Sequence, residues 1–252
     1  MLNQSANPVA KAAHAHGDRL VTRLTWIGPA IGLTAAAVVL ASCHRKAEEA
    51  QAPAAPPVAA ESERTSPVHW NAAAGAFELG GKALKTVKLW TFDGSTDGFT
   101  ALGTRIAPAA GQGITVTIAD PTIRSPKGLN VPGQQYALVL VRLTRVQAGS
   151  GWDGALYYST ANHPETINFL GKPLSGANPK VGETTTLVYD MSRQALGAPD
   201  WSQSTIDQIR FDIEDKPGGV FVIRQVAIAE NPDPAALAPM AAPAAAPAPA
   251  KP

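Results

Sequence analysis

The sequence predicts an all-β domain, a jelly-roll β-sandwich of two antiparallel sheets, set between Ala/Pro-rich segments that are expected to be disordered. Three observations predict it. Apolar and β-branched residues alternate with a period of two in seven segments, turn-rich stretches separate these segments, and no part of the domain sustains a 3.6-residue apolar stripe. Because the Ala/Pro segments occupy much of the 252 residues, we expect one domain.

The turn residues Asp, Gly, Ser and Pro gather between the expected strands, notably at 93–95, 125–128 and 216–219. The expected strands cover residues 86–92, 113–119, 136–146, 155–160, 184–191, 206–213 and 219–229. The segment 70–85 is ambiguous, because its alanines allow a short helix whereas its three glycines oppose one.

Two strands are expected to define the interior. Residues 136–146 are apolar on both faces, which predicts a central strand. In 206–213 the alternation is one-sided. Ile209, Phe211 and Ile213 should point into the sandwich, and Arg210 and Asp212 should point outward.

The amino-terminal region has the order of a signal peptide: a basic segment, then an apolar run over 24–40, then the chain's only cysteine. The quartet Leu40-Ala41-Ser42-Cys43 resembles the lipobox of bacterial lipoproteins. This resemblance implies that residues 1–42 are removed and that Cys43 carries lipid, which would tether the protein to a membrane. A single cysteine excludes an internal disulfide.

Two alternatives stay open at this end. A non-ATG start near Val21 would give a signal peptide of ordinary length, and an uncleaved transmembrane anchor would use the 17 residues of 24–40. Under the lipoprotein interpretation, 43–67 is a tether, 68–230 is the domain and 231–252 is a tail. His44 replaces the aspartate that would retain such a protein at the inner membrane. The resemblance therefore implies a cell-envelope, extracytoplasmic location, at the outer membrane in a Gram-negative host.

The charge balance excludes one class of partner. The chain has 21 Lys and Arg against 20 Asp and Glu, so it lacks the basic excess that binding to nucleic-acid phosphates requires. We expect no nucleic-acid partner.

Five segments of the domain are similar to galactose-binding-like jelly rolls, which occur as carbohydrate-binding modules. They read LWTFDGSTDGF (89–99), ADPTIRSPKGLNV (119–131), QYALVLVRL (135–143), ALYYST (155–160) and DQIRFDIEDKPGGVFVIRQVAIAE (207–230). Relatives often carry an Ile-Asp pair near a structural calcium in the last strand, where this chain has Ile223-Arg224. The expectation is therefore no cofactor and no metal. Asp93, Asp97 and Asp120 are weak candidates for calcium ligands.

No recognised catalytic motif is present: the sequence has no HExxH, no Gly-rich phosphate loop and no GxSxG. His163 lies in a turn-like sequence and is expected to be a surface loop residue. Asp153, Asp190, Asp212 and Glu214 keep a polysaccharide lyase or hydrolase open as a third hypothesis.

Sugar recognition uses aromatic rings together with planar hydrogen-bonding groups. The ligand-binding candidates are accordingly Arg142, Trp152, Tyr157, Tyr158, Trp201, Arg210 and Asp212. Arg142, Arg210 and Asp212 would line one surface if their strands share a sheet. The structural alternatives are core packing for Tyr158 and Trp201, and cross-strand pairing for Arg210 and Asp212.

The resulting expectation is a non-enzymatic, lipid-anchored domain that binds cell-envelope or extracellular polysaccharide. The alternative is a structural or assembly lipoprotein that binds a protein partner through the same sheet or the Ala/Pro tail.

Overall fold

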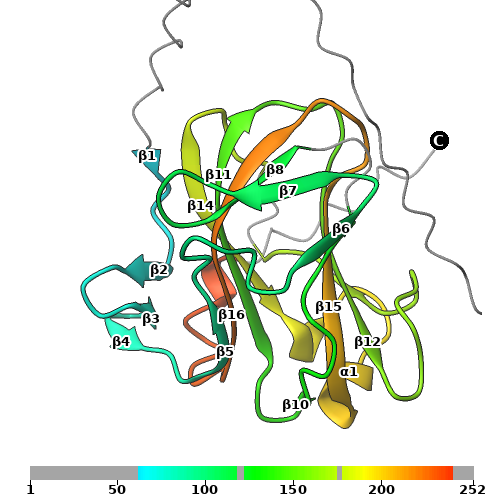
Figure 1. The fold of residues 1–252 in the computed structure, drawn as a ribbon. Coiled ribbons are helices and arrows are strands. Elements are labelled where there is room, and N and C mark those ends of the chain that lie inside the picture. Colours follow the sequence, from blue (N-terminus) through cyan, green and yellow to red (C-terminus); the bar gives the residue numbers. More distant parts are fainter. Residues whose placement is uncertain (1–61, 118–121, 175–177, 241–252) are drawn as a thin grey trace, which may run out of the picture. The chain divides into compact units, whose positions relative to one another are not determined.

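The computed structural model describes residues 62–117, 122–174 and 178–240, which form a β-sandwich (Figure 1). The expected signal peptide, Cys43, most of the tether and Asp120 lie outside these residues. Within the described ranges, no helix has both the length and the apolar character needed to cross a membrane.

The first sheet, here sheet I, has seven strands and is antiparallel except for the β1–β14 pair. Its strands in order are β1 (Ser62–Glu63), β14 (Glu183–Asp190), β11 (Leu138–Gln147), β16 (Val220–Ala229), β8 (Ile114–Thr117) and β7 (Arg105–Pro108), with β5 (Thr86–Trp90) paired to the other end of β16. The long strands β11 and β16 lie at its centre.

The second sheet, sheet II, has six antiparallel strands. Its order is β13 (Leu170–Gly171), β12 (Trp152–Thr160), β15 (Thr205–Glu214), β9 (Thr122–Arg124) and β6 (Thr100–Leu102), with β10 (Val131–Pro132) paired to β15. The short helices η1 (Met191–Arg193) and α1 (Asp200–Gln203) lie in the connection from β14 to β15.

The main core lies between the two sheets. Val139, Val141 and Leu143 of β11 belong to the same buried cluster as Ile209 and Phe211 of β15. This arrangement confirms the predicted β-sandwich and the inward direction of the apolar residues in 206–213. All seven expected strands are present, with ends that differ by a few residues.

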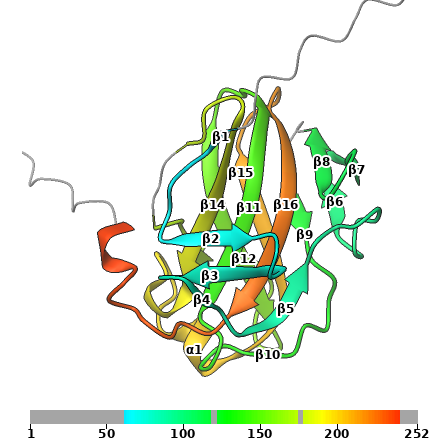
Figure 2. The ribbon, with the colours of Figure 1, turned by 90° about the vertical axis from the view of Figure 1, so that its left-hand side faces the viewer.

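A third, three-stranded sheet covers the outer face of sheet I. Its strands β2 (Val68–Asn71), β3 (Ala76–Leu79) and β4 (Lys82–Ala83) run crosswise over β14, β11 and β16 (Figure 2). Phe77 of β3 packs in one cluster with Leu138 and Leu140 of β11. The ambiguous segment 70–85 therefore contains strands rather than a helix, and the second apolar face of β11 is explained.

Residues just outside the expected domain limits, 68 and 230, also contact the domain. At the amino-terminal side, the Arg64 amide donates to Thr184 O at 2.8 Å, and the Arg64 guanidinium pairs with Glu183 at 2.6 Å. At the carboxyl side, Leu237 is fully buried in the outer cluster, just before the short helix η2 (Ala238–Met240). The Ala/Pro-rich composition of 231–252 does not predict this contact, because a single leucine makes it.

A buried ion pair joins the two sheets at one end of the sandwich. Arg145 of β11 donates to Glu214 of β15 at 2.5 Å, and both side chains are almost fully buried. The arginine also lies over the Phe221 ring, 5.5 Å from its centroid. Gly149 is required beside the carboxylate, because a β-carbon there would lie 1.5 Å from Glu214 Oε2.

Replacing Arg145 with methionine should destabilise the domain by about 3–5 kcal/mol, because Glu214 would remain buried without its partner. The measurement is urea unfolding of Arg145→Met, Glu214→Gln and the double variant. We expect the double variant to lose less than the two single losses combined. Strictly additive losses would contradict a direct role for the pair.

Candidate functional site

The outward face of sheet II carries a row of polar side chains, one from each of four adjacent strands. Tyr157 of β12 lies opposite Arg210 of β15, Arg210 opposite Arg124 of β9, and Arg124 opposite Thr100 of β6. We call these four residues the arginine row. Because neighbouring strands are about 4.8 Å apart, the row spans roughly 14 Å across the sheet. Alternation places these side chains outward, since Ile123, Tyr158 and Phe211 beside them point into the core.

The Arg210 side chain is held by the Tyr157 ring and by Asp212. Its Cζ lies 4.2 Å from the centroid of the Tyr157 ring, and its Nε donates to Asp212 Oδ1 at 2.8 Å. Burial raises the pKa of Asp212, although Arg210 opposes that shift. Burial alone would lower the pKa of Arg210, but its pairing with Asp212 and Glu165 raises the pKa overall. The guanidinium therefore stays charged and is fixed in position.

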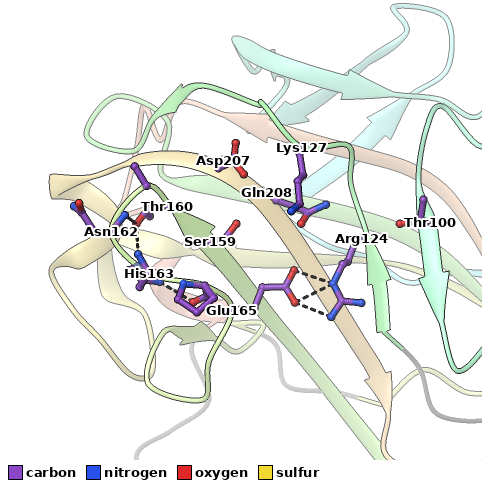
Figure 3. A pocket seen from close by; sticks show the side chains of 12 residues that line it. Thr100, Arg124, Lys127, Ser159, Thr160, Asn162, His163, Glu165, Asp207 and Gln208 are labelled. Atoms are coloured by element: carbon purple, nitrogen blue, oxygen red, sulfur yellow. Dashed lines mark hydrogen bonds and ion pairs between the residues drawn. The ribbon is translucent and has the colours of Figure 1, made fainter. Parts of the chain in front are cut away.

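Glu165 reaches the row from the loop between β12 and β13. Arg124 donates to this carboxylate from Nε at 2.9 Å and from Nη2 at 2.8 Å, and Arg210 Nη1 lies 3.4 Å from it. Figure 3 shows Arg124 and Glu165 facing each other across the site. Arg124 is also held by its own strand, since Nη1 donates to Thr122 Oγ1 at 2.9 Å. The two arginines thus converge on one carboxylate.

His163 anchors the same loop. Its ring stacks on Phe169 with the centroids 3.7 Å apart, and its Nε2 lies 2.9 Å from Asp200 Oδ2. Tyr158 Oη donates to the same Asp200 oxygen at 2.9 Å. His163 is therefore a loop residue, as predicted, but it is largely covered and positions the loop that carries Glu165.

An open cleft of about 700 Å³ lies in front of Arg124 and Glu165. Strand residues Thr100, Arg124 and Ser159 line it on one side, and the loop over 160–165 lines it on another. Lys127 and Asp207 form the remaining charged wall (Figure 3). Tyr157, Arg210 and Asp212 continue the same face of sheet II beyond Glu165. The site can therefore offer hydrogen-bonding groups to an extended polar ligand.

The structure brings together three of the seven residues predicted to bind ligand: Tyr157, Arg210 and Asp212. It does not bring Arg142 to them, because β11 belongs to sheet I and β15 to sheet II. Arg142 pairs instead with Glu63 at 2.9 Å and with Gln225 at 3.1 Å. The expectation that Arg142, Arg210 and Asp212 share one surface is corrected.

The other three predicted aromatics pack toward the interior. Tyr158 and Trp201 are fully buried with their rings in edge contact, and Trp201 Nε1 donates to Tyr136 O at 3.0 Å. Trp152 packs against the main core, 6.2 Å from the Phe221 ring. Tyr158 and Trp201 are therefore core residues, which is the structural alternative given for them above.

Sequence reasoning missed Arg124, Glu165 and Lys127. A signal for Arg124 exists, because Thr122-Ile123-Arg124 alternates polar, apolar and polar beside a turn. It is only three residues long, which is too short to predict a strand. Glu165 lies in a loop, where no periodic pattern predicts which way a side chain points.

The candidate calcium ligands do not form a site among the described residues. Asp97 accepts from the Phe92 amide at 2.8 Å and from Ser95, within its own loop, and Asp93 is exposed. No group of three potential ligands that could hold a metal occurs in the described ranges. Asp120 lies outside them.

No protein-family model matches the chain. No curated protein matches it either.

Several solved structures resemble the chain at low identity. The family 11 carbohydrate-binding module of cellulase Lic26A-Cel5E from Clostridium thermocellum is 14% identical, with a TM-score of 0.43 over 60% of this chain and 97% of that module. The C-terminal family 22 module of Clostridium thermocellum Xyn10B is 15% identical, with a TM-score of 0.41 over 59% and 96%. The family 29 module CBM29_1 from Piromyces equi is 11% identical, with a TM-score of 0.37 over 59% and 87%.

Proposed function

We propose that this protein binds a polysaccharide, without cleaving it, on the outward face of sheet II. The observation that carries the proposal is the arginine row: four strands place Tyr157, Arg210, Arg124 and Thr100 in direct register, and Arg124 and Thr100 line an open cleft. A row that crosses the strands suits a linear chain with repeated polar groups.

The chemistry of the row suits sugar hydroxyls. A guanidinium donates through several N–H groups in one plane, and a carboxylate accepts through two oxygens, so the pair can bind adjacent hydroxyls that both donate and accept. Tyr157 contributes by holding the Arg210 guanidinium against its ring. Arg210 is already fixed by Tyr157 and Asp212, so little side-chain entropy would be lost on binding.

Binding fits this face better than catalysis. Glycoside hydrolysis needs two carboxyl groups, one of which gives a proton to the leaving oxygen. Glu165 and Asp212 are both engaged by arginines, which suits hydrogen bonding to hydroxyls rather than proton transfer.

The binding test is affinity electrophoresis of the full chain in gels that contain neutral or acidic polysaccharides, one polymer per gel. Arg210→Gln and Tyr157→Ala should weaken retardation, with a loss of roughly tenfold or more in affinity for Arg210→Gln. Arg142→Gln is the matched control, since this arginine is also paired but lies on sheet I.

Two results would overturn the proposal. One is that no polymer retards the wild-type protein. The other is that Arg142→Gln weakens retardation as much as Arg210→Gln while urea unfolding shows that all variants remain folded.

The proposal includes attachment to a membrane through lipid on Cys43, with the domain on the extracytoplasmic side. The support is the sequence order of basic segment, apolar run, Leu40-Ala41-Ser42-Cys43 and Ala/Pro tether. Several acyl chains on one cysteine would make release from the membrane negligible, since each buried CH₂ contributes about 0.8 kcal/mol.

Cys43→Ala tests the anchor. The lipoprotein interpretation predicts that the variant loses labelling by radioactive palmitate and moves from the membrane fraction to the soluble fraction. Ser42→Ala is the control, because a small residue before the cysteine is kept. A Cys43→Ala protein that stays with the membranes would favour the uncleaved anchor over 24–40.

A further inference from the structure

The strongest feature beyond the general binding face is the way two arginines converge on Glu165. We infer that Arg124 and Arg210 form a recognition site for the carboxylate of an acidic sugar, and that Glu165 occupies this site when no ligand is bound. The inference rests on the proposed function and names its substrate class: polysaccharides that contain uronic acid residues.

The geometry already matches a carboxylate. Arg124 meets Glu165 in a two-pronged arrangement, with Nε 2.9 Å from Oε1 and Nη2 2.8 Å from Oε2. Planar two-pronged contacts of this kind are the preferred way in which proteins bind carboxylates. Arg210 supplies a longer contact of 3.4 Å to Oε2. A uronate carboxylate placed where the Glu165 carboxylate lies would meet the same donors.

Each of the two arginines also has a partner other than Glu165. Arg124 is held by Thr122 at 2.9 Å, and Arg210 is held by Asp212 at 2.8 Å and by the Tyr157 ring. If the Glu165 side chain withdrew, these contacts would remain, and Arg124 would lose only its contacts with the carboxylate. The site is therefore organised in advance for an anion that comes from outside the chain.

Glu165 can leave only if its contacts with Arg124 and Arg210 are replaced, and a ligand carboxylate in the same place would replace them. Glu165 belongs to a loop rather than a strand, and its neighbours Pro164 and Ile167 are exposed. The loop is fixed by His163, through Phe169 and Asp200, and not by Glu165 alone. A change in the Glu165 rotamer would open the site without moving the strands.

The charge around the cleft also favours an acidic ligand once Glu165 has moved. Arg124 and Lys127 line the cleft with Asp207, and Arg210 lies beside them with Asp212, while Asp153 nearby is paired with Lys172. Asp212 is already paired with Arg210, and Asp207 accepts from the Gly128 amide at 2.9 Å. The two guanidinium groups released by Glu165 would attract the carboxylates of a polyanion, and added salt would weaken this attraction.

The experiment compares acidic polymers with esters of the same backbone. Probes are alginate and polygalacturonate, each beside its propylene glycol or methyl ester, and two neutral polymers, xylan and galactomannan. We expect the full chain to bind at least one acidic form roughly tenfold more tightly than its ester, because esterification removes the charged acceptor. Raised salt should reduce this difference.

Two variants test the two roles separately: Glu165 as a competitor of the ligand carboxylate, and Arg124 as its binding partner. Glu165→Gln removes the competing charge and should raise the affinity for the acidic form several-fold, whereas Arg124→Gln should lower it by roughly tenfold. Glu63→Gln is the matched control, because it removes the carboxylate partner of Arg142 on sheet I. It should leave the affinity unchanged.

The outcomes distinguish a failure of the carboxylate site from a failure of polysaccharide binding. If neutral or esterified polymers bind as well as the acidic forms, or if Glu165→Gln lowers the affinity for the acidic form, the carboxylate site is overturned while polysaccharide binding stands. If no acidic, esterified or neutral polymer binds, both this inference and the proposed function are overturned.

Discussion

Ile209, Phe211 and Ile213 of β15 are buried between the two sheets, and this burial fixes the direction of the residues between them. Because side chains alternate along a strand, Arg210 and Asp212 must lie on the outward face. Neighbouring strands extend the same constraint, since Ile123 of β9 and Tyr158 of β12 are also buried. The arginine row is thus a consequence of how the core packs.

The two sheets differ in what covers their outer faces. The three-stranded sheet and the segment that contains Leu237 pack on the outer face of sheet I. The outward face of sheet II instead borders an open cleft and carries ion pairs. Chemically similar pairs, Arg142 with Glu63 and Arg210 with Asp212, therefore lie in different surroundings.

Much of the fold follows from the sequence, because long strands alternate over many residues. All seven segments with clear alternation are strands, and the two apolar faces of β11 match the two clusters on either side of it. The short strands β2, β4, β6 and β9 contain too few residues to show a period. The local sequence pattern therefore predicts the long strands but does not predict how many short strands accompany them.

The site was less predictable, because membership of a sheet depends on pairing between distant segments. Arg142 and Arg210 both alternate outward along their strands, and only the pairing of β11 with β14 and β16 separates Arg142 from the site. Arg124 and Glu165 come together from a three-residue strand and a loop that are 41 positions apart. No local pattern encodes that contact.

The central claim is that ligand binds the arginine row on sheet II. The most direct measurement follows the side-chain Nε–H resonances of the arginines by NMR while an oligosaccharide from a retained polymer is added to the full chain. The account predicts saturable shifts for Arg124 and Arg210 and none for Arg142. Shifts confined to Arg142, or an absence of shifts at both Arg124 and Arg210 under conditions of saturation, would contradict it.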